Sequence, residues 1–97
     1  AARQLASLAL ASSPDQNARL DFITLRLGGR TFDADERKIA RKSLDLGLAT
    51  YRKQPEDAMK LITTGETPPR KDADVPELAA WTLLASQVLN LDETITR

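Results

Sequence analysis

The side chains that most often carry catalysis are missing from this sequence of 97 residues, which contains no histidine and no cysteine. Serine, lysine and carboxylates are therefore the nucleophiles and bases that the chain could use. Without cysteine, disulfides and thiolate metal sites are also excluded. We predict that the chain is not an enzyme, and that it has no catalytic, cofactor-binding or metal-binding residues.

The carboxylates that come closest together have structural explanations. Asp33, Asp35 and Glu36 lie in the stretch "DADE", which suits the start of a helix because acidic side chains interact favourably with the positive end of the helix dipole. Asp92 and Glu93 could be considered as Ca²⁺ ligands, but a calcium loop needs several oxygens at regular spacing. We interpret this second pair as helix-end and surface ion-pair residues.

Two further features resemble ligand sites but are better explained by folding. Gly28 and Gly29 precede Arg30, yet no strand comes before them and no Gly-Lys-Ser/Thr follows, as a phosphate loop would require. They predict the end of a helix, where glycine closes the last turn in a left-handed conformation. Met59 is a conceivable haem ligand, but a lone methionine is expected to fill the core.

The alternative function is nucleic-acid binding by a helix-turn-helix. A helix bearing Arg37, Lys38, Arg41 and Lys42 follows a glycine-containing turn, which is the general outline of that motif. However, fourteen basic residues balance fourteen acidic ones, so the formal net charge is zero and the chain has no overall attraction for phosphates. The acidic start of the same helix would repel them too.

The helices that position these residues follow from their start and stop signals. An Ala- and Leu-rich segment over residues 2–12 predicts a first helix, with Leu5 and Leu8 at helical spacing. Ser13 is expected to cap a second helix, with Pro14 at its first position and Gln16 in capping-box register. The apolar stripe of that helix comprises Leu20, Ile23 and Leu27, with Phe22 and Leu25 beside it.

A third and longest helix is predicted over residues 34–53, with Asp33 and Glu36 forming a capping box and Pro55 ending it. A short helix should begin at Pro55 and end at Gly65. The loop over residues 66–74 then leads to a further cap at Asp74, with Glu77 three residues later. In the helix over residues 34–53, the residues expected to face the core are Ala40, Leu44, Leu48 and Tyr51, whereas Lys38, Arg41, Asp45 and Arg52 should face away from it. In the short helix that begins at Pro55, Met59 and Ile62 are expected to face the core.

The stretch "LAAWTLLASQVLNL" over residues 78–91 carries no charge, although 29% of the chain is charged. As a helix it would span about 21 Å, which is too short for the roughly 30 Å of a bilayer core, so we predict no membrane span. Its main stripe is Trp81, Leu84, Val88 and Leu91, with Leu78, Ala85 and Leu89 near it and Thr82, Ser86 and Asn90 on the remaining side. A helix apolar over most of its circumference needs neighbours on several sides, so we expect it at the centre of a bundle.

These elements predict an all-α fold: one compact bundle of four to five helices over residues 1–97, with the C-terminal Trp-containing helix central. No stretch alternates with period two for long enough to indicate a strand. The chain begins Ala1-Ala2-Arg3 without an initiator methionine, and we expect it to be a C-terminal fragment of a larger protein.

Two stretches resemble a known family. "LAAWTLLASQVLNLDETITR" and, overlapping its start, "GETPPRKDADVPELAAW" resemble the closing segment of large multidomain proteins of planctomycetes and related bacteria. "LRLGGRTFDADE" is similar to a helix junction common in the same proteins, but it has an extra glycine and has Phe32 where that pattern has proline. The resemblance covers residues 21–97.

The resemblance implies a setting rather than an activity. Such proteins typically carry an upstream cytochrome c module, then domains of uncharacterised function, and they look extracytoplasmic. A haem module needs Cys-x-x-Cys-His, so any haem would lie outside this chain, and no binding residue is carried over. The implied function is a non-catalytic C-terminal structural or protein-interaction domain, whose partners are upstream domains of the same polypeptide or another protein. No small-molecule ligand is inferred.

An interaction module and a passive structural cap predict different surfaces. The former should expose an apolar patch of several hundred Å², whereas the latter should not.

Overall fold

The computed structural model describes residues 2–28, 31–63 and 74–95, and their side chains except those of residues 2, 27, 28 and 89–95. The described residues form five helices and no strand, so the all-α prediction is confirmed. The Cα radius of gyration is 12.9 Å, close to the roughly 12.5 Å expected for a folded domain of this length. The helices are α1 (Ala2–Ser12), α2 (Gln16–Gly28), α3 (Ala34–Lys53), α4 (Pro55–Thr63) and α5 (Val75–Ile95).

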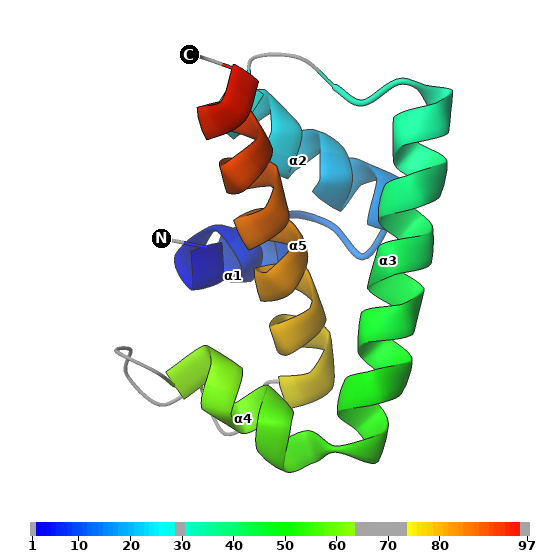
Figure 1. The fold of residues 1–97 in the computed structure, drawn as a ribbon. Coiled ribbons are helices and arrows are strands. Elements are labelled where there is room, and N and C mark those ends of the chain that lie inside the picture. The colour runs from blue at the N-terminus through cyan, green and yellow to red at the C-terminus, as the bar shows by residue number, and fades with distance from the viewer. Residues whose placement is uncertain (1, 29–30, 64–73, 96–97) are drawn as a thin grey trace.

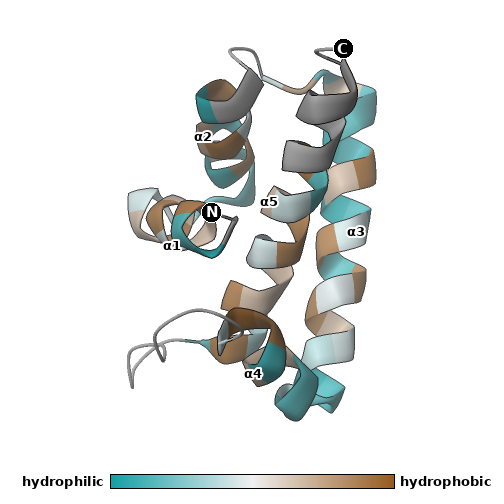
Figure 2. Ribbon diagram, turned by 60° about the vertical axis from the view of Figure 1, so that its left-hand side comes forward, coloured by the Kyte–Doolittle hydropathy of each residue, from teal (hydrophilic) through white to brown (hydrophobic). Residues whose placement is uncertain are grey.

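Helix α5 lies at the centre of the bundle, as predicted. It contacts all four other helices, most extensively α1 and α3. In Figure 1, α3 runs alongside α5 and α4 lies across the N-terminal end of α5. In the turned view of Figure 2, α3 lies on one side of α5, and α1 and α2 lie on the other. Figure 2 shows the same arrangement with the largely apolar α5 between its more polar neighbours.

The burial of α5 explains why its sequence is uncharged. Trp81 is completely shielded from solvent and is the largest fully buried side chain described. Its buried neighbours on α5 are Leu78, Ala79, Ala80, Thr82, Leu84, Ala85 and Val88. Thr82, expected on a polar side of the helix, is buried as well; its Oγ1 donates to the carbonyl of Leu78 at 2.7 Å, which satisfies the hydroxyl within the helix. None of the described helices combines the length and apolar character needed to cross a bilayer.

Helix α1 packs through alanines rather than through its larger residues. Ala6 and Ala9 are fully buried, while Leu8 is 43% exposed. Small side chains allow the backbones of α1 and α5 to approach closely, and Leu5 and Leu10 cover the edges of this contact. Two of the expected stripe residues of α2, Leu20 and Ile23, are buried as predicted.

The predicted cap of α2 is wrong by two residues. Asp15, not Ser13, caps the helix, because its Oδ2 accepts from the Ala18 amide at 3.1 Å. The Ser13 Oγ instead accepts from the Asp15 amide at 3.1 Å, so it fixes the turn before the helix. Aspartate is as good a cap as serine and adds a negative charge at the positive end of the dipole.

Helix α3 has the predicted bounds and start. The Asp33 carboxylate accepts from the Glu36 amide at 2.8 Å, and the Glu36 carboxylate accepts from the Asp33 amide at 3.0 Å, which completes the capping box. Ala40 and Leu44 are buried, and Leu48 and Tyr51 pack against the core at its edge. The apolar stripe predicted for this helix is therefore confirmed.

Helix α4 begins at Pro55 as predicted, but one inward residue is wrong. Ile62 is fully buried, whereas Met59 is 41% exposed and the fully buried partner of Ile62 is Ala58. Residues four apart share a helix face, so Ala58 and Ile62 together define the buried side, and Met59 lies to one side of it. Arg3 of α1 donates from Nη1 to the Ile62 carbonyl at 2.7 Å, which satisfies a backbone acceptor in the last turn of α4. The end predicted at Gly65, and the loop up to residue 73, lie outside the described residues.

The start of α5 is tied to α2 by a charged contact. Asp74 caps the helix, with its Oδ1 accepting from the Glu77 amide at 3.3 Å. The Glu77 carboxylate accepts from Nη1 of Arg19 at 2.6 Å, and the Arg19 guanidinium carbon lies 5.8 Å from the centroid of the Trp81 ring. This arrangement places a cation over the buried indole, where a cation–π contact is favourable.

Candidate interaction site

The described residues expose five large apolar side chains, and the two most exposed belong to α3. Ile39 is 71% exposed and Leu46 is 62% exposed. The two are seven residues apart, so they lie on one face of the helix about 10 Å from each other. The other three exposed apolar side chains are Leu8 on α1, Leu25 on α2 and Met59 on α4.

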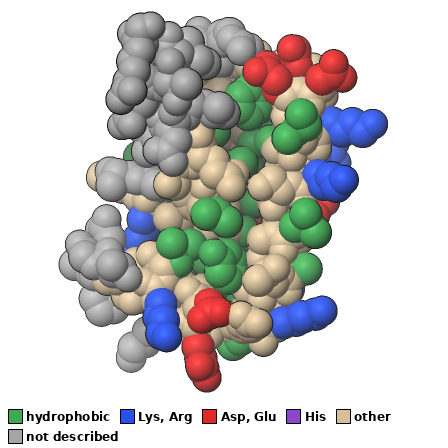
Figure 3. All heavy atoms as spheres, viewed as in Figure 1, with side chains coloured by type: hydrophobic (Ala, Val, Ile, Leu, Met, Phe, Trp, Pro, Cys, Tyr) green, Lys and Arg blue, Asp and Glu red, His purple; other side chains and the backbone are tan. Residues whose placement is uncertain are grey.

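Ile39 and Leu46 line a groove between α3 and α5. One hollow of about 240 Å³ is lined by Phe32, Glu36, Ile39, Ala40, Ser43, Leu84, Gln87 and Val88. A second, of about 250 Å³, is lined by Ser43, Leu46, Gly47, Thr50, Tyr51 and Leu83. Ser43 lines both hollows and its Oγ lies 3.4 Å from Oε1 of Gln87, so this polar contact divides one continuous seam. We call the two hollows together the α3–α5 groove; hydrophobic side chains gather on this face over both helices (Figure 3).

The groove is built on the close approach of α3 and α5. Gly47 faces Ala80, and a Cβ atom added to Gly47 would lie 3.5 Å from the Ala80 Cβ, an ordinary van der Waals distance. Larger side chains at these two positions would push the helices apart. Gly47 forms part of the floor of the hollow that Leu46 of α3 and Leu83 of α5 line. The other hollow is lined by Ile39 of α3 and by Leu84 and Val88 of α5, among others.

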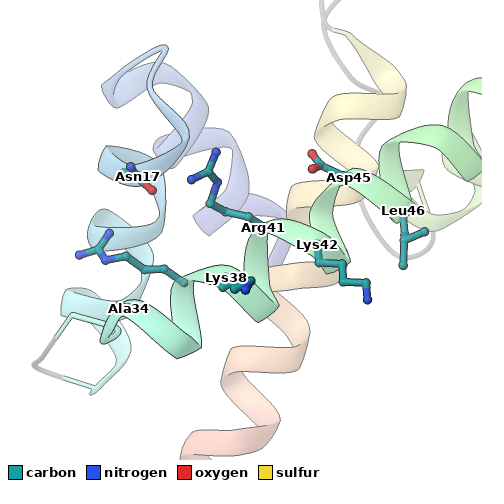
Figure 4. A pocket seen from close by; sticks show the side chains of 8 residues that line it. Asn17, Ala34, Lys38, Arg41, Lys42, Asp45 and Leu46 are labelled. Carbon is teal, nitrogen blue, oxygen red and sulfur yellow. The ribbon is translucent and has the colours of Figure 1, made fainter.

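A third hollow, of about 600 Å³, lies on the α2 side of α3 and has a charged lining. We call it the basic hollow. It is lined by Asn17, Ala34, Arg37, Lys38, Arg41, Lys42, Asp45 and Leu46. In Figure 4, Arg41 projects towards α2, where Asn17 lies, while Lys42 and Leu46 project to the other side of α3. Lys42 and Leu46 thus stand between the basic hollow and the α3–α5 groove.

The cations of α3 are only partly neutralised. Arg37 forms an ion pair with Asp21 of α2, and Arg52 forms a longer one, 3.7 Å, with Asp74. Within the described part of the chain, Lys38, Arg41 and Lys42 have no such partner. Helix α3 carries six basic and three acidic residues, although the whole chain has a formal net charge of zero. Its outer face is therefore locally positive.

The residues considered as sites in the sequence fall into separate places. Asp33 and Glu36 form the capping box of α3, and Asp35 is an exposed acid in its first turn. Met59 is exposed on α4. No group of three or more potential metal-ligating side chains occurs among the described residues.

The remaining candidates are described only by their backbone or not at all. Helix α2 ends at Gly28, as predicted, while Gly29 and Arg30 lie outside the described residues. Helix α5 continues to Ile95, so Asp92 and Glu93 belong to the helix rather than following it, and their side chains lie outside the description. The same is true of the side chains of Leu27, Leu89, Asn90 and Leu91.

Sequence reasoning did not single out Ile39 and Leu46, although a signal for them exists. Ile39 and Leu46 repeat at a spacing of two turns, but they are offset from the buried positions Ala40 and Leu44. A helix with one apolar stripe for its own core and a second, separate apolar pair has more hydrophobic surface than one core needs. The sequence does predict, by contrast, that Lys38, Arg41, Asp45 and Arg52 face away from the core, and all four are exposed.

Comparison of the chain with protein-family models, with curated proteins and with solved structures gave no match in any of the three.

Proposed function

We propose that this chain is a non-catalytic protein-interaction domain that binds its partner through the α3–α5 groove. The observation that carries the proposal is the exposure of Ile39 and Leu46, at 71% and 62%, on one face of α3 beside a hollow with apolar walls. A domain whose only role is to cover the end of a larger fold has no need of large apolar side chains on its outer face. An apolar patch next to unpaired charges is typical of a recognition surface.

The magnitudes favour this interpretation. Burying an isoleucine or leucine side chain stabilises a complex by roughly 1.5–3 kcal/mol. Two such residues at the centre of an interface are enough to act as anchors, because a few residues usually dominate binding. The neighbouring hollows would receive the corresponding apolar side chains of the partner.

Selection of random peptides displayed on phage tests the proposal. The wild-type domain is the bait, and the counter-selected bait is the double variant Ile39→Asp with Leu46→Asp. We expect peptides that bind the wild type and lose at least about tenfold in affinity for the double variant, because each substitution places a charge in the interface. Leu25→Asp is the matched control, since Leu25 is 52% exposed but lies on α2, away from the groove. Enrichment of no peptide, or of peptides that bind the double variant equally well, would contradict the proposal.

The wider setting implied by the sequence resemblance stays a prediction. It predicts that this domain lies at the C-terminal end of a larger, extracytoplasmic, cytochrome-linked bacterial protein, with upstream domains of the same chain or another protein as partners. A Cys-x-x-Cys-His module encoded upstream in the same gene would support that setting. A gene with no such module would contradict the link to cytochromes.

The helix-turn-helix alternative is favoured by one observation: Lys38, Arg41 and Lys42 lie on the exposed face of α3 and have no ion-pair partner in the part of the chain that the structure describes. Against it, Asp35 and Asp45 lie on the same exposed surface, where they would repel phosphates. A titration of random duplex DNA, followed by electrophoretic mobility shift, separates the two functions. Salt-dependent binding at submicromolar protein that is lost in the Lys38→Glu, Lys42→Glu double variant would favour the alternative.

A further inference from the structure

We propose that the partner of the α3–α5 groove is an acidic amphipathic helix, with apolar residues seven positions apart and carboxylates facing Lys38 and Lys42. This inference rests on the proposed function and adds the chemistry of the partner to it.

The shape of the groove fits a helix. Its two hollows follow one another along α3, one beside Ile39 and the other beside Leu46. A helix lying along the seam would present side chains at positions i and i+7, about 10 Å apart, one to each hollow. The Ser43–Gln87 contact lies between the two hollows, so it would face the turn of the partner helix that separates its two apolar anchors and is less apolar than they are. The described part of the chain has no strand, so it offers an extended peptide no sheet edge to join.

The positive charge on α3 beside the groove favours an acidic partner. Lys42 is three residues after Ile39 and four before Leu46, so it lies next to both anchors on the helix surface. Lys38 is one turn away from Lys42, and neither lysine has an ion-pair partner among the described residues. The opposite wall, contributed by residues 83–88 of α5, carries no charge. Glu36 lines the far end of the first hollow, where its carboxylate accepts from the Asp33 amide. Carboxylates that flank the partner's anchors away from this end would therefore meet cations along the rim of α3 and no charge along α5.

The same charge disfavours a second copy of this chain as the occupant. A twofold interface brings identical surfaces together. Lys42 lies midway between Ile39 and Leu46, so in an antiparallel pair of α3 helices centred on the groove it would approach its own counterpart. Like charges brought together at the centre of an interface are destabilising.

Three synthetic helical peptides test the inference. They share leucine at i, i+4 and i+7 and differ only at the positions that flank this stripe, which are all glutamate, all glutamine or all lysine. Fluorescence anisotropy measures the Kd of each labelled peptide for the wild-type chain. We expect the glutamate peptide to bind about tenfold more tightly than the lysine peptide, with the glutamine peptide between them, and the difference to shrink as salt is added.

Two double variants separate charge from hydrophobic docking. Lys38→Glu with Lys42→Glu should reverse the order of the three peptides, whereas Arg26→Glu with Lys60→Glu, the same change of charge on α2 and α4, should leave the order intact. Ile39→Asp with Leu46→Asp should abolish binding of all three.

The possible results have separate meanings. Equal affinities of the three peptides for the wild type, with loss in the Ile39→Asp, Leu46→Asp variant, would overturn the acidic partner but leave the proposed function standing. Absence of binding, or binding unaffected by that variant, would overturn the helix-in-groove inference, and the phage selection would then decide the proposed function separately. Concentration-dependent dimerisation in sedimentation experiments that disappears in the same variant would overturn the acidic partner, because a second copy of the chain would then fill the groove. The groove would remain the interaction surface in that case.

Discussion

Helices α5 and α3 both carry large apolar side chains, but they use them in opposite ways. Around α5, the other helices cover nearly the whole circumference over residues 78–88, and Trp81 has no exposed surface. On α3, one stripe packs into the core while Ile39 and Leu46 point away from it, 71% and 62% exposed. The same residue types therefore determine stability on one helix and are free for recognition on the other.

The difference between the two helices lies in their charges as well. No charge occurs in α5 from Leu78 to Val88, since a buried charge would need a partner in the core. Helix α3 carries nine charged residues, and four of its cations (Lys38, Arg41, Lys42 and Lys53) have no ion-pair partner in the described part of the chain. The comparison teaches that hydrophobicity alone does not locate a core.

The largest expected effect is that of Trp81→Ala. Removing the indole leaves a cavity in the hydrophobic core, where Trp81 is the largest fully buried side chain described. We expect a loss of about 3–5 kcal/mol in the free energy of unfolding. That is a large part of the stability of a domain this size. Urea denaturation followed by circular dichroism measures it. A loss below about 1 kcal/mol would contradict the central position of α5.

Asp33→Ala should cost about 1 kcal/mol, because it removes the cap that receives the Glu36 amide at 2.8 Å. The expected effect is smaller than that of Trp81→Ala because α3 is held mainly by its buried stripe. Thermal unfolding of Asp33→Ala beside Asp33→Asn measures the cap separately from the charge, since asparagine keeps the acceptor. Equal losses in the two variants would mean that the charge, not the cap, matters.

Gly47→Ala should stabilise the chain, by about 0.5–1 kcal/mol. Glycine in the middle of a helix is unfavourable relative to alanine, and the added Cβ would lie at an ordinary contact distance of 3.5 Å from the Ala80 Cβ. The urea midpoint should therefore rise. Destabilisation would show that the two helices have no room at this crossing, and that the groove floor depends on glycine itself.

The smallest expected effect on stability is that of Ile39→Asp and Leu46→Asp. Because both side chains are mostly exposed, each substitution should change the free energy of unfolding by no more than about 0.5 kcal/mol. Urea denaturation of the two single variants is the measurement. A loss of several kcal/mol in either would show that these residues belong to the core, and would remove the distinction between α3 and α5.

Much of the fold could be predicted from the sequence because its signals are local. Asp33 and Glu36 have the spacing of a capping box, Pro55 ends one helix and starts the next, and the uncharged run identifies the buried helix. The errors arose where two residues of similar propensity compete. Asp15 displaced Ser13 as the cap of α2, and Ala58 rather than Met59 faces the core, a choice set by how α4 packs on α5.

The candidate site was less predictable because it depends on which sides of α3 its neighbours cover. The pattern of Ile39 and Leu46 is visible in the sequence, but only the packing of α5 against Ala40 and Leu44 leaves that pair exposed. The alanine-lined contact of α1 was hidden for a similar reason, since Ala6 and Ala9 were less prominent than Leu5 and Leu8.

Chemical-shift mapping tests the docking surface most directly. The ¹⁵N-labelled chain is titrated with the glutamate peptide, and the amide and side-chain signals are followed. We expect the largest shifts at Ile39, Ser43, Leu46 and Gln87, with little change in the Trp81 indole signal, because the partner would bind over the core without entering it. Shifts centred on Asn17 and Arg37 in the basic hollow, or large changes at Trp81, would contradict the account.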